Sequence, residues 1–409
     1  MVPEGWSSAT VGSLFDVQLG KMLNKAAKEK YPQFPYLGNT NVKWGHFDCE
    51  SMNTMYFSEK DREKFALKNG DILLCEGGEV GRCAIWRAQR ENVFYQKALH
   101  RLRSNGAIIP EFFQAYIEKV SGTKVLDDLT TRTSIAHLTR EKLVELVIKL
   151  PPILEQKKIA TVLSTWDEAI ATTKQLLASS ERQKKALMQQ LLTGKKRLAG
   201  FEGEWPFVTM GQIFRRVTTR NEGQSTNVVT MSGQQGLIRQ QEFFKKSVAS
   251  ETLDAYFLLK KGQFAYNKSY SNGYPMGAIK RLNRYEKAVV TTLYICFEIE
   301  NEDVSDSDYF EHFFEAGLLN HGLSKVANEG GRAHGLLNVK PSDFFSLQVP
   351  LPKLKEQEAI ARVITAAEED IQRFKLDLEL LKEEKRALMQ QLLTGKRRVK
   401  VPEAEPATA

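Results

Sequence analysis

Two stretches of the chain share one spacing of apolar residues. In residues 155–198 and 356–399, apolar side chains recur at alternating intervals of three and four residues, as in helices that pair along an apolar seam. Neither seam contains proline or glycine, and Gly194 and Gly395 stand where each helix should end. The expected seam consists of Ile159, Leu163, Trp166, Ile170, Leu177, Lys184, Leu187 and Leu191 in the first helix and of Ile360, Ile364, Ala367, Ile371, Phe374, Leu378, Leu381, Lys385, Leu388 and Leu392 in the second.

These two stretches also repeat each other. They align without a gap, and the run ALMQQLLTGK occurs identically at 186–195 and 387–396. Fainter matches precede each repeat, such as Trp6 with Trp205. The middles of the two halves look unrelated, so the pattern indicates one duplication that kept a frame while two surfaces diverged. Packing of each helix on its own domain is the alternative to mutual pairing.

The direction of the helix pair follows from its polar seam positions. Lys184 and Lys385 occupy the same place in the two repeats, so a parallel, in-register pair would bring like charges together. An antiparallel pair with full overlap places Lys184 opposite Ala367, and Lys385 opposite Trp166, whose ring could lie under the ammonium. The same register pairs Ile159 with Leu392, Leu163 with Leu388, Ile170 with Leu381, and Leu187 with Ile364.

The segments outside the repeats have mixed α/β patterns. Strand-like runs are Asp71–Cys75, Cys83–Trp86, Phe264–Asn267, Val289–Tyr294 and Tyr294–Ile299, and helix-like runs are Pro110–Val120, Arg140–Leu146 and Asp308–Leu319. We expect an α+β fold in which two α/β domains are separated by the antiparallel coiled coil, with internal pseudo-two-fold symmetry. The expected boundaries are 1–150 and 201–350 for the domains, 151–200 and 351–399 for the helical segments, and 400–409 for a disordered tail.

Charge and loop chemistry point to nucleic acid. The net charge of +8 and the pI near 9.1 favour a polyanionic partner. Several loops mix small, polar, aromatic and basic residues that reach base edges and phosphates, although any one of them could be a solvated turn. The candidate DNA contacts are Asn39, Thr40, Asn41, Lys43, Trp44, Arg82, Thr131, Arg132, Thr133 and Ser134 in the first half, and Asn267, Lys268, Ser269, Tyr270, Ser271, Asn272, Arg332 and His334 in the second.

Motifs for catalysis, metal binding and membrane insertion are missing from the sequence. There is no Asn/Asp-Pro-Pro-aromatic tetrapeptide of amino-methyltransferases and no phosphate-binding loop. The four cysteines form no zinc spacing, and scattered thiols are typical of a reducing cytoplasm. No apolar stretch reaches the roughly 18 residues of a membrane helix. We therefore expect a cytoplasmic protein with no catalytic residues, no metal and no cofactor of its own.

Several motifs together carry a resemblance that covers the whole length. They are Leu-Pro-Pro-Ile-Leu-Glu-Gln at 150–156, its echo at 351–357, both copies of Leu-Leu-Thr-Gly-Lys, Lys-Asn-Gly-Asp-Ile-Leu at 68–73, and Gly-Arg-Cys-Ala-Ile at 81–85. In this combination the chain resembles the specificity subunits of type I restriction–modification enzymes.

The resemblance implies two target recognition domains, each reading half of a split, asymmetric site on double-stranded DNA. It further implies that the helical repeats act as a ruler and bind two modification subunits, with restriction/translocase subunits in the complete enzyme. S-adenosylmethionine, ATP and Mg²⁺ would then belong to those partners. Two alternatives remain: a non-catalytic coiled-coil adaptor without sequence-specific DNA reading, and an enzyme with a hidden active site.

Overall fold

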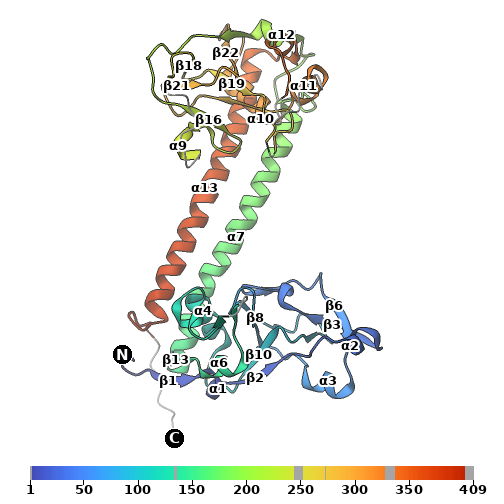
Figure 1. The fold of residues 1–409 in the computed structure, drawn as a ribbon, viewed down its shortest axis with the longest axis vertical. Coiled ribbons are helices and arrows are strands. Elements are labelled where there is room, and N and C mark those ends of the chain that lie inside the picture. The colour runs from blue at the N-terminus through green and yellow to red at the C-terminus, as the bar shows by residue number, and fades with distance from the viewer. Residues whose placement is uncertain (1, 133–135, 244–251, 272, 328–336, 401–409) are drawn as a thin grey trace. The chain divides into compact units, whose positions relative to one another are not determined.

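The computed structural model describes residues 2–132, 136–243, 252–271, 273–327 and 337–400. The chain divides into two compact units: unit 1 is residues 1–174 with 376–409, and unit 2 is residues 175–375. Each unit therefore combines one globular half of the sequence with one segment of each repeat (Figure 1).

Unit 1 is built on a four-stranded antiparallel sheet. Its elements are β1 (Ser7–Thr10), α1 (Val11–Leu14), β2 (Phe15–Leu19), α2 (Lys25–Glu29), β3 (Gln33–Leu37), the 3-10 helix η1 (Asn39–Asn41), β4 (Val42–Lys43), β5 (His46–Phe47), β6 (Asn53–Tyr56), α3 (Glu59–Lys64), β7 (Ile72–Cys75), β8 (Cys83–Ile85), β9 (Phe94–Tyr95), β10 (Leu99–Ser104), α4 (Pro110–Val120), α5 (Lys124–Asp127), β11 (Thr131–Arg132), β12 (Ala136–His137), α6 (Arg140–Glu145) and β13 (Val147–Leu150). The strand order is β2-β10-β7-β8. In β7, Ile72 and Leu74 join the core that contains α4, whereas Leu73 and Cys75 join a second core. A strand buried on both faces needs this continuous apolar run.

Unit 2 repeats that architecture. Its elements are β14 (Phe207–Thr209), α8 (Met210–Ile213), β15 (Phe214–Val217), β16 (Val229–Ser232), β17 (Gly236–Arg239), α9 (Gln240–Phe243), β18 (Phe257–Lys260), β19 (Phe264–Asn267), β20 (Ala278–Arg281), β21 (Lys287–Val290), β22 (Ile295–Ile299), α10 (Ser307–Glu315), α11 (Asn320–Val326), α12 (Pro341–Phe345) and β23 (Gln348–Pro350). Its sheet has the order β15-β22-β19-β20, and β14 pairs with β23 as β1 pairs with β13. The α+β fold with an internal repeat is thereby confirmed.

Two of the expected elements end earlier than their apolar patterns suggested. The strand expected over Val289–Tyr294 stops at Val290, because residues 291–294 form a turn in which the Tyr294 amide donates to the Thr291 carbonyl over 3.2 Å. The helix expected over Asp308–Leu319 stops at Glu315. Gly317 follows with φ of +69°, a left-handed conformation that ends helices and favours glycine.

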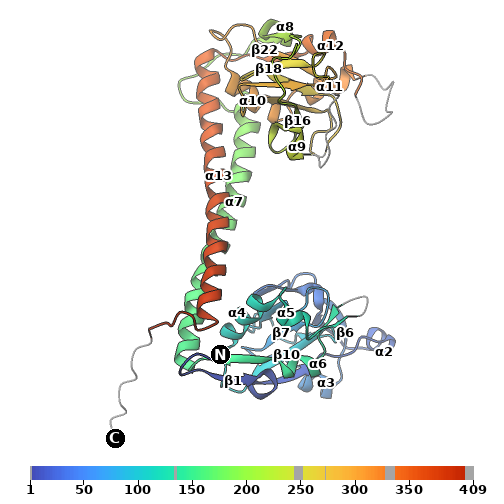
Figure 2. The same ribbon diagram turned by 60° about the vertical axis from the view of Figure 1, so that its left-hand side comes forward.

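Both repeats form long, unbroken helices, α7 (Ile153–Leu191) and α13 (Leu354–Leu392). In unit 1, Ile159 of α7 shares a core with Leu392 at the end of α13. In unit 2, Leu191 shares a core with Ile360 near the start of α13. The segments that lie beside each other therefore run in opposite directions in each unit (Figures 1 and 2). The antiparallel pairing is confirmed, and every expected seam residue is buried or half-buried.

The two seam lysines bind carboxylates. Lys385 Nζ lies 2.7 Å from both oxygens of Glu118 on α4 and 2.7 Å from Asp167 on α7. The Trp166 indole donates instead to Glu384 over 3.1 Å, so the expected stacking of Lys385 on that ring is replaced by ion pairs. Two carboxylates stabilise a buried ammonium more strongly than a ring face does.

Lys184, the matching lysine of α7, pairs with Glu368 in unit 2. Its Nζ lies 3.2 Å from the nearer Glu368 oxygen. Glu368 directly follows Ala367, the residue that the full-overlap register placed opposite Lys184. The ammonium therefore binds the residue next to the one that this register predicts.

Candidate nucleic-acid interface

In unit 1, several of the candidate loops converge at one edge. Asn39 begins η1 directly after β3, and its side-chain amide donates to the Gly77 carbonyl over 2.8 Å. Gly77 in turn forms an isolated bridge with His137 of β12. The η1 loop, the β7–β8 loop and the β11–β12 hairpin are therefore neighbours. Thr131 and Arg132 form β11, whereas Thr133 and Ser134 lie outside the described residues.

Arg82 holds this edge together. Its guanidinium donates to the backbone and side-chain oxygens of Asn39 over 2.9 and 2.8 Å and forms a 3.1 Å ion pair with Glu79. Glu79 also accepts a hydrogen bond from the Trp44 indole over 2.6 Å. The Trp44 and Arg82 bonds hold the pKa of Glu79 below its usual range. Arg82, Asn39 and Trp44 therefore fix the positions of these loops, Arg82 by binding Asn39 and both Arg82 and Trp44 by binding Glu79.

The other candidates in unit 1 differ in whether their side chains are bonded within the unit or exposed to a ligand. Asn41 is buried, its amide oxygen accepts from the Gly38 amide over 2.9 Å, and its nitrogen donates to the Asp48 carbonyl over 3.1 Å. It therefore shapes the turn. Thr40 and Lys43 are exposed at the same edge and can meet a ligand. Lys97 is also exposed, in the loop whose Ala98 carbonyl accepts from the Glu76 amide, and it is not among the DNA contacts expected from the sequence.

In unit 2, the candidate Asn267 ends β19, and the candidates 268–271 begin the loop that leads to β20. Asn267 accepts from the Ser269 amide over 3.1 Å, and the Lys268 carbonyl accepts from the Leu337 amide over 2.9 Å. Burial lowers the pKa of Lys268. Tyr270 and Ser271 are exposed, so the loop has a fixed base and a free polar tip. Asn272, Arg332 and His334 lie outside the described residues.

The described residues offer neither a metal cluster nor a reactive thiol. Within them, no group of three or more His, Cys, Asp or Glu side chains could hold a metal ion. Burial raises the pKa of all four thiols, that of Cys75 to about 11 and that of Cys296 to about 12, so they stay protonated at neutral pH. Nor does any helix of these residues have the length and apolarity needed to cross a membrane.

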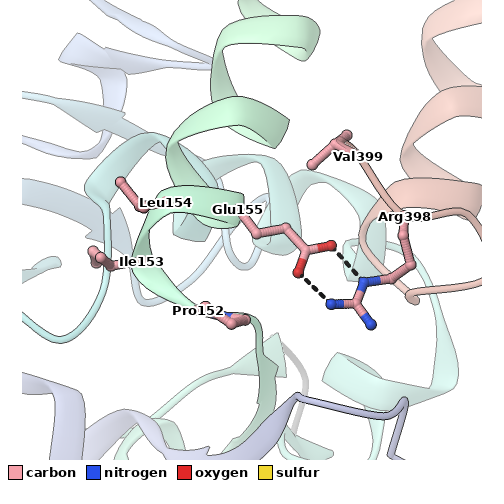
Figure 3. A pocket seen from close by; sticks show the side chains of 6 residues that line it. All are labelled: Pro152, Ile153, Leu154, Glu155, Arg398 and Val399. Atoms are coloured by element: carbon pink, nitrogen blue, oxygen red, sulfur yellow. Dashed lines mark hydrogen bonds and ion pairs between the residues drawn. The ribbon is translucent and has the colours of Figure 1, made fainter. Parts of the chain in front are cut away.

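Each repeat begins with a buried glutamate bound by an arginine and a tryptophan. In unit 1, Glu155 accepts from Arg398 over 2.7 and 2.8 Å and from the Trp6 indole over 3.1 Å; this is the Glu155 cluster. Figure 3 shows Glu155 and Arg398 facing each other. Both line a hollow with a volume of about 440 Å³. The remaining lining residues of the hollow are Pro152, Ile153, Leu154 and Val399. Since both oxygens of the carboxylate are engaged, the hollow presents an apolar wall and no free acid.

Unit 2 contains the same arrangement. Glu356 accepts from Arg197 over 2.5 and 2.7 Å and from the Trp205 indole over 3.1 Å; this is the Glu356 cluster. The glutamine after each glutamate also has matching partners. Gln156 accepts from the Ile109 amide before α4, and Gln357 accepts from the Asp306 amide before α10. These contacts fix each repeat helix to its globular domain.

Comparisons with known proteins agree with this duplicated architecture. Residues 3–182 match the family model described as type I restriction modification DNA specificity domain. The chain is 22% identical over 98% of its length to the putative type I restriction enzyme MjaX specificity subunit of Methanocaldococcus jannaschii, covering 95% of that protein. It is 25% identical to the EcoKI specificity subunit of Escherichia coli over 35% of this chain and 32% of that one.

Solved structures share the fold. The S subunit of a type I restriction–modification system from M. genitalium matches with a TM-score of 0.57 at 16% identity, over 96% of both chains. The HsdS subunit from Thermoanaerobacter tengcongensis matches with a TM-score of 0.53 at 15% identity, over 97% of this chain and 98% of that one. The family model shows that residues 3–182 are a type I restriction modification DNA specificity domain, and over its full length the chain is similar to specificity subunits of type I restriction enzymes.

Proposed function

We propose that each unit reads one half of a bipartite DNA site and that the paired helices bind two modification subunits. The duplicated frame with diverged loops carries this proposal. Both units share a strand order and a buried glutamate cluster, yet the β7–β8 and β19–β20 loops differ in sequence and in the side chains that hold them. A frame repeated under two different surfaces suits a protein that needs two specificities.

The exposed residues of these loops have the chemistry of DNA contacts. In unit 1, Lys43 can bind a phosphate and Thr40 can bind a base edge or a sugar. In unit 2, Ser271 can act in the same way, and Tyr270 adds a polar aromatic side chain. Each loop stands on a sheet buried on both faces, so the reading groups are carried by a rigid support.

The partners would supply all bond-breaking chemistry. The modification subunits would bring S-adenosylmethionine, and restriction/translocase subunits would bring ATP and Mg²⁺. We expect purified chain to transfer no methyl group from S-adenosylmethionine to DNA, and the same chain to support transfer once modification subunits are added. Robust transfer by the chain alone would favour the alternative of an enzyme with its own active site.

Half-site exchange tests the central claim. The chain is assembled with its modification subunits and used to select from duplexes with a randomised central segment. Residues 201–350 are then replaced by the equivalent segment of a relative, and the selection is repeated. We expect one half of the selected sequence to change and the other half to persist. A change in both halves would contradict separate readers, and selection of no sequence at all would favour a coiled-coil adaptor.

Helix length tests the ruler. Inserting one heptad into residues 170–185 of α7 adds about 10 Å of helix, equivalent to about three base pairs. We expect selection with this variant to yield a longer spacer between half-sites, or binding to be lost. Selection of the original spacer at full affinity would contradict a role for the helices in spacing.

A further inference from the structure

The β19–β20 loop of unit 2 is anchored at both ends by hydrogen bonds. Gly277 has φ of +76°, and a Cβ there would lie 2.3 Å from the Asn267 carbonyl oxygen, so only glycine fits where the two ends of the loop meet. The Tyr266 hydroxyl donates to the Met276 carbonyl over 2.8 Å. The Gly277 amide donates to the Tyr274 carbonyl over 3.2 Å. These bonds fix the base of the loop, and its exposed part needs a further contact to keep one conformation.

The Tyr274 side chain supplies this contact for the β19–β20 loop. Its ring lies against Gly233 in the β16–β17 turn, where a Cβ would come within 2.7 Å of a ring carbon. The hydroxyl lies 2.8 Å from the Gly233 carbonyl and 2.8 Å from Glu315 Oε1, and it accepts a 2.9 Å hydrogen bond from Lys280 Nζ. The hydroxyl has a single proton, so it accepts from Lys280 and shares that proton between the Gly233 carbonyl and Glu315.

Lys280 and Glu315 complete the set. The Lys280 side chain is 11% exposed and forms an ion pair with Glu315 at the end of α10. Burial would favour neutral lysine, but Glu315 and the Tyr274 hydroxyl outweigh it and raise the pKa of Lys280. The ammonium also lies 4.8 Å from the centre of the Tyr274 ring. Because its charge is neutralised inside the unit, Lys280 is not available to bind a DNA phosphate.

Unit 1 uses the matching helix position differently. Glu118 follows the buried Ile117 of α4 as Glu315 follows the buried Phe314 of α10. Glu118 binds Lys385 of the long helix α13, whereas Glu315 binds the reading loop of its own unit. The set of Tyr274, Lys280 and Glu315 is therefore not part of the repeated frame. It belongs to the diverged surface, where specificity resides.

We propose that Tyr274, Lys280 and Glu315 are positioning residues that hold the β19–β20 loop in the shape that reads DNA. The proposal rests on the function proposed above, since it assumes that this loop contacts one half-site. A loop fixed before binding loses less conformational entropy in the complex, and its exposed groups meet the bases in one arrangement. Loosening the set should therefore lower discrimination at a single half-site.

The test uses full-length chain assembled with its modification subunits and the tightest duplex from the randomised selection. Affinity is measured for that duplex and for derivatives with substitutions in one half-site or the other. We expect Tyr274→Phe to reduce the preference for the correct base pairs of one half-site about five-fold, because the hydroxyl bonds are lost while the Lys280–Glu315 ion pair remains. Glu315→Gln should reduce it about thirty-fold, because the ion pair is lost as well. Preference at the other half-site should be unchanged.

Two controls separate positioning from folding. Tyr285→Phe removes the same atom from the same unit, at an exposed 3.4 Å contact with Glu242, and should leave both preferences intact. The three positioning residues act as a unit, so Tyr274→Phe should add little in a Glu315→Gln background. Equal losses at both half-sites, additive effects, or full discrimination by both variants would overturn the proposal. If the wild-type assembly itself prefers no sequence, the proposed function fails first, and this inference fails with it.

Discussion

The Glu155 and Glu356 clusters share their contacts but differ in how the chain connects them. Arg197 and Trp205 are joined by a short segment between the end of α7 and β14. Their counterparts Arg398 and Trp6 come from opposite ends of the chain. The same geometry forms in both units, so it is set by the helix end and the first strand pair rather than by a covalent link. The short connecting segment in unit 2 changes only the entropy lost when the Arg and the Trp are brought together.

The two arginines also differ in exposure. The Arg197 side chain is 23% exposed and that of Arg398 is 44% exposed, while their glutamates are almost fully buried. Both arginines have a further bond to a backbone carbonyl, that of Gly203 or of Glu4. Water therefore screens the Glu155 cluster more than the Glu356 cluster. The comparison predicts that unit 2 depends more on its cluster than unit 1 does.

The largest effect is expected for Arg197→Ala. Among the described residues, it leaves the buried Glu356 carboxylate with the Trp205 indole as its remaining hydrogen-bond partner. Breaking a buried ion pair from one side costs about 3–5 kcal/mol, and partial exposure of the arginine puts this case near 3 kcal/mol. Thermal unfolding should show the unit 2 transition lowered by about 10 °C. Arg373→Ala, which removes an exposed arginine paired with Asp370 on α13, is the control and should change the midpoint little.

Arg398→Ala should cost less, about 2 kcal/mol, because water reaches that pair more freely. A chain ended after Arg397 should behave like this variant, whereas a chain ended after Val399 should behave like the wild type. The readout is the unfolding midpoint of unit 1. A loss for Arg398→Ala that exceeds the loss for Arg197→Ala would show that connection at the chain ends matters more than burial.

A third comparison uses one buried histidine in each unit. Burial lowers the pKa of His100, against the opposing hydrogen bond to the Leu138 carbonyl. Burial likewise lowers the pKa of His312, which bonds Thr365 over 2.9 Å; nearby Glu368 opposes the shift and Lys184 adds to it. Each folded unit thus keeps its imidazole neutral at pH values where the unfolded chain is already protonated.

Acid should therefore weaken both units. As pH falls through the ordinary histidine value of about 6.5 toward the lower folded pKa, the unfolded state binds more protons and the free energy of unfolding falls, by at most about 1.4 kcal/mol per pH unit for each histidine. Denaturant unfolding at several pH values measures this slope. His100→Gln should flatten it in unit 1 only, and His312→Gln in unit 2 only. An unchanged slope in both variants would assign the acid sensitivity to carboxylates.

The helix pair and the repeated frame could be predicted from sequence because their signals are local and periodic. Ile159 and Leu392 follow from a stripe of regular spacing, and its two like-charged lysines determine the direction. The strands β7 and β19 follow from short apolar runs. The predicted ends of β21 and α10 were wrong, because the strand stops at a turn after Val290 and the helix stops before a left-handed glycine after Glu315. The pattern of apolar residues contains no information on either feature.

The DNA-binding interface was harder to predict, because a polar or charged side chain can either contact DNA or bind other side chains of its own unit. Arg82 has the chemistry of a DNA contact, but in the folded unit its donors bind Asn39 and Glu79. Lys280 and Glu315 are 35 positions apart, and nothing in the sequence marks them as an interacting pair. Only tertiary contacts reveal which polar side chains are already satisfied. The two glutamate clusters do have a signal in the sequence, since a Trp, a Glu-Gln pair and an Arg occur in both halves.

The smallest effects are expected at the two seam lysines. Lys385 is 7% exposed and binds Glu118 and Asp167, whereas Lys184 pairs with one carboxylate of the described residues, that of Glu368. Methionine keeps the length of the lysine stem and suits an apolar seam. The carboxylates left behind are 35%, 53% and 45% exposed and can hydrate. We therefore expect Lys385→Met to lower the free energy of unfolding by only about 1 kcal/mol and Lys184→Met by about 0.5 kcal/mol, as measured by denaturant unfolding.

Combining Lys385→Met with Glu118→Gln tests the origin of the difference between the two lysines. If the three-helix ion pair of unit 1 accounts for it, the double variant should be no less stable than Lys385→Met alone. A larger cost for Lys184→Met would mean that seam packing, and not the ion pairs, distinguishes the two units.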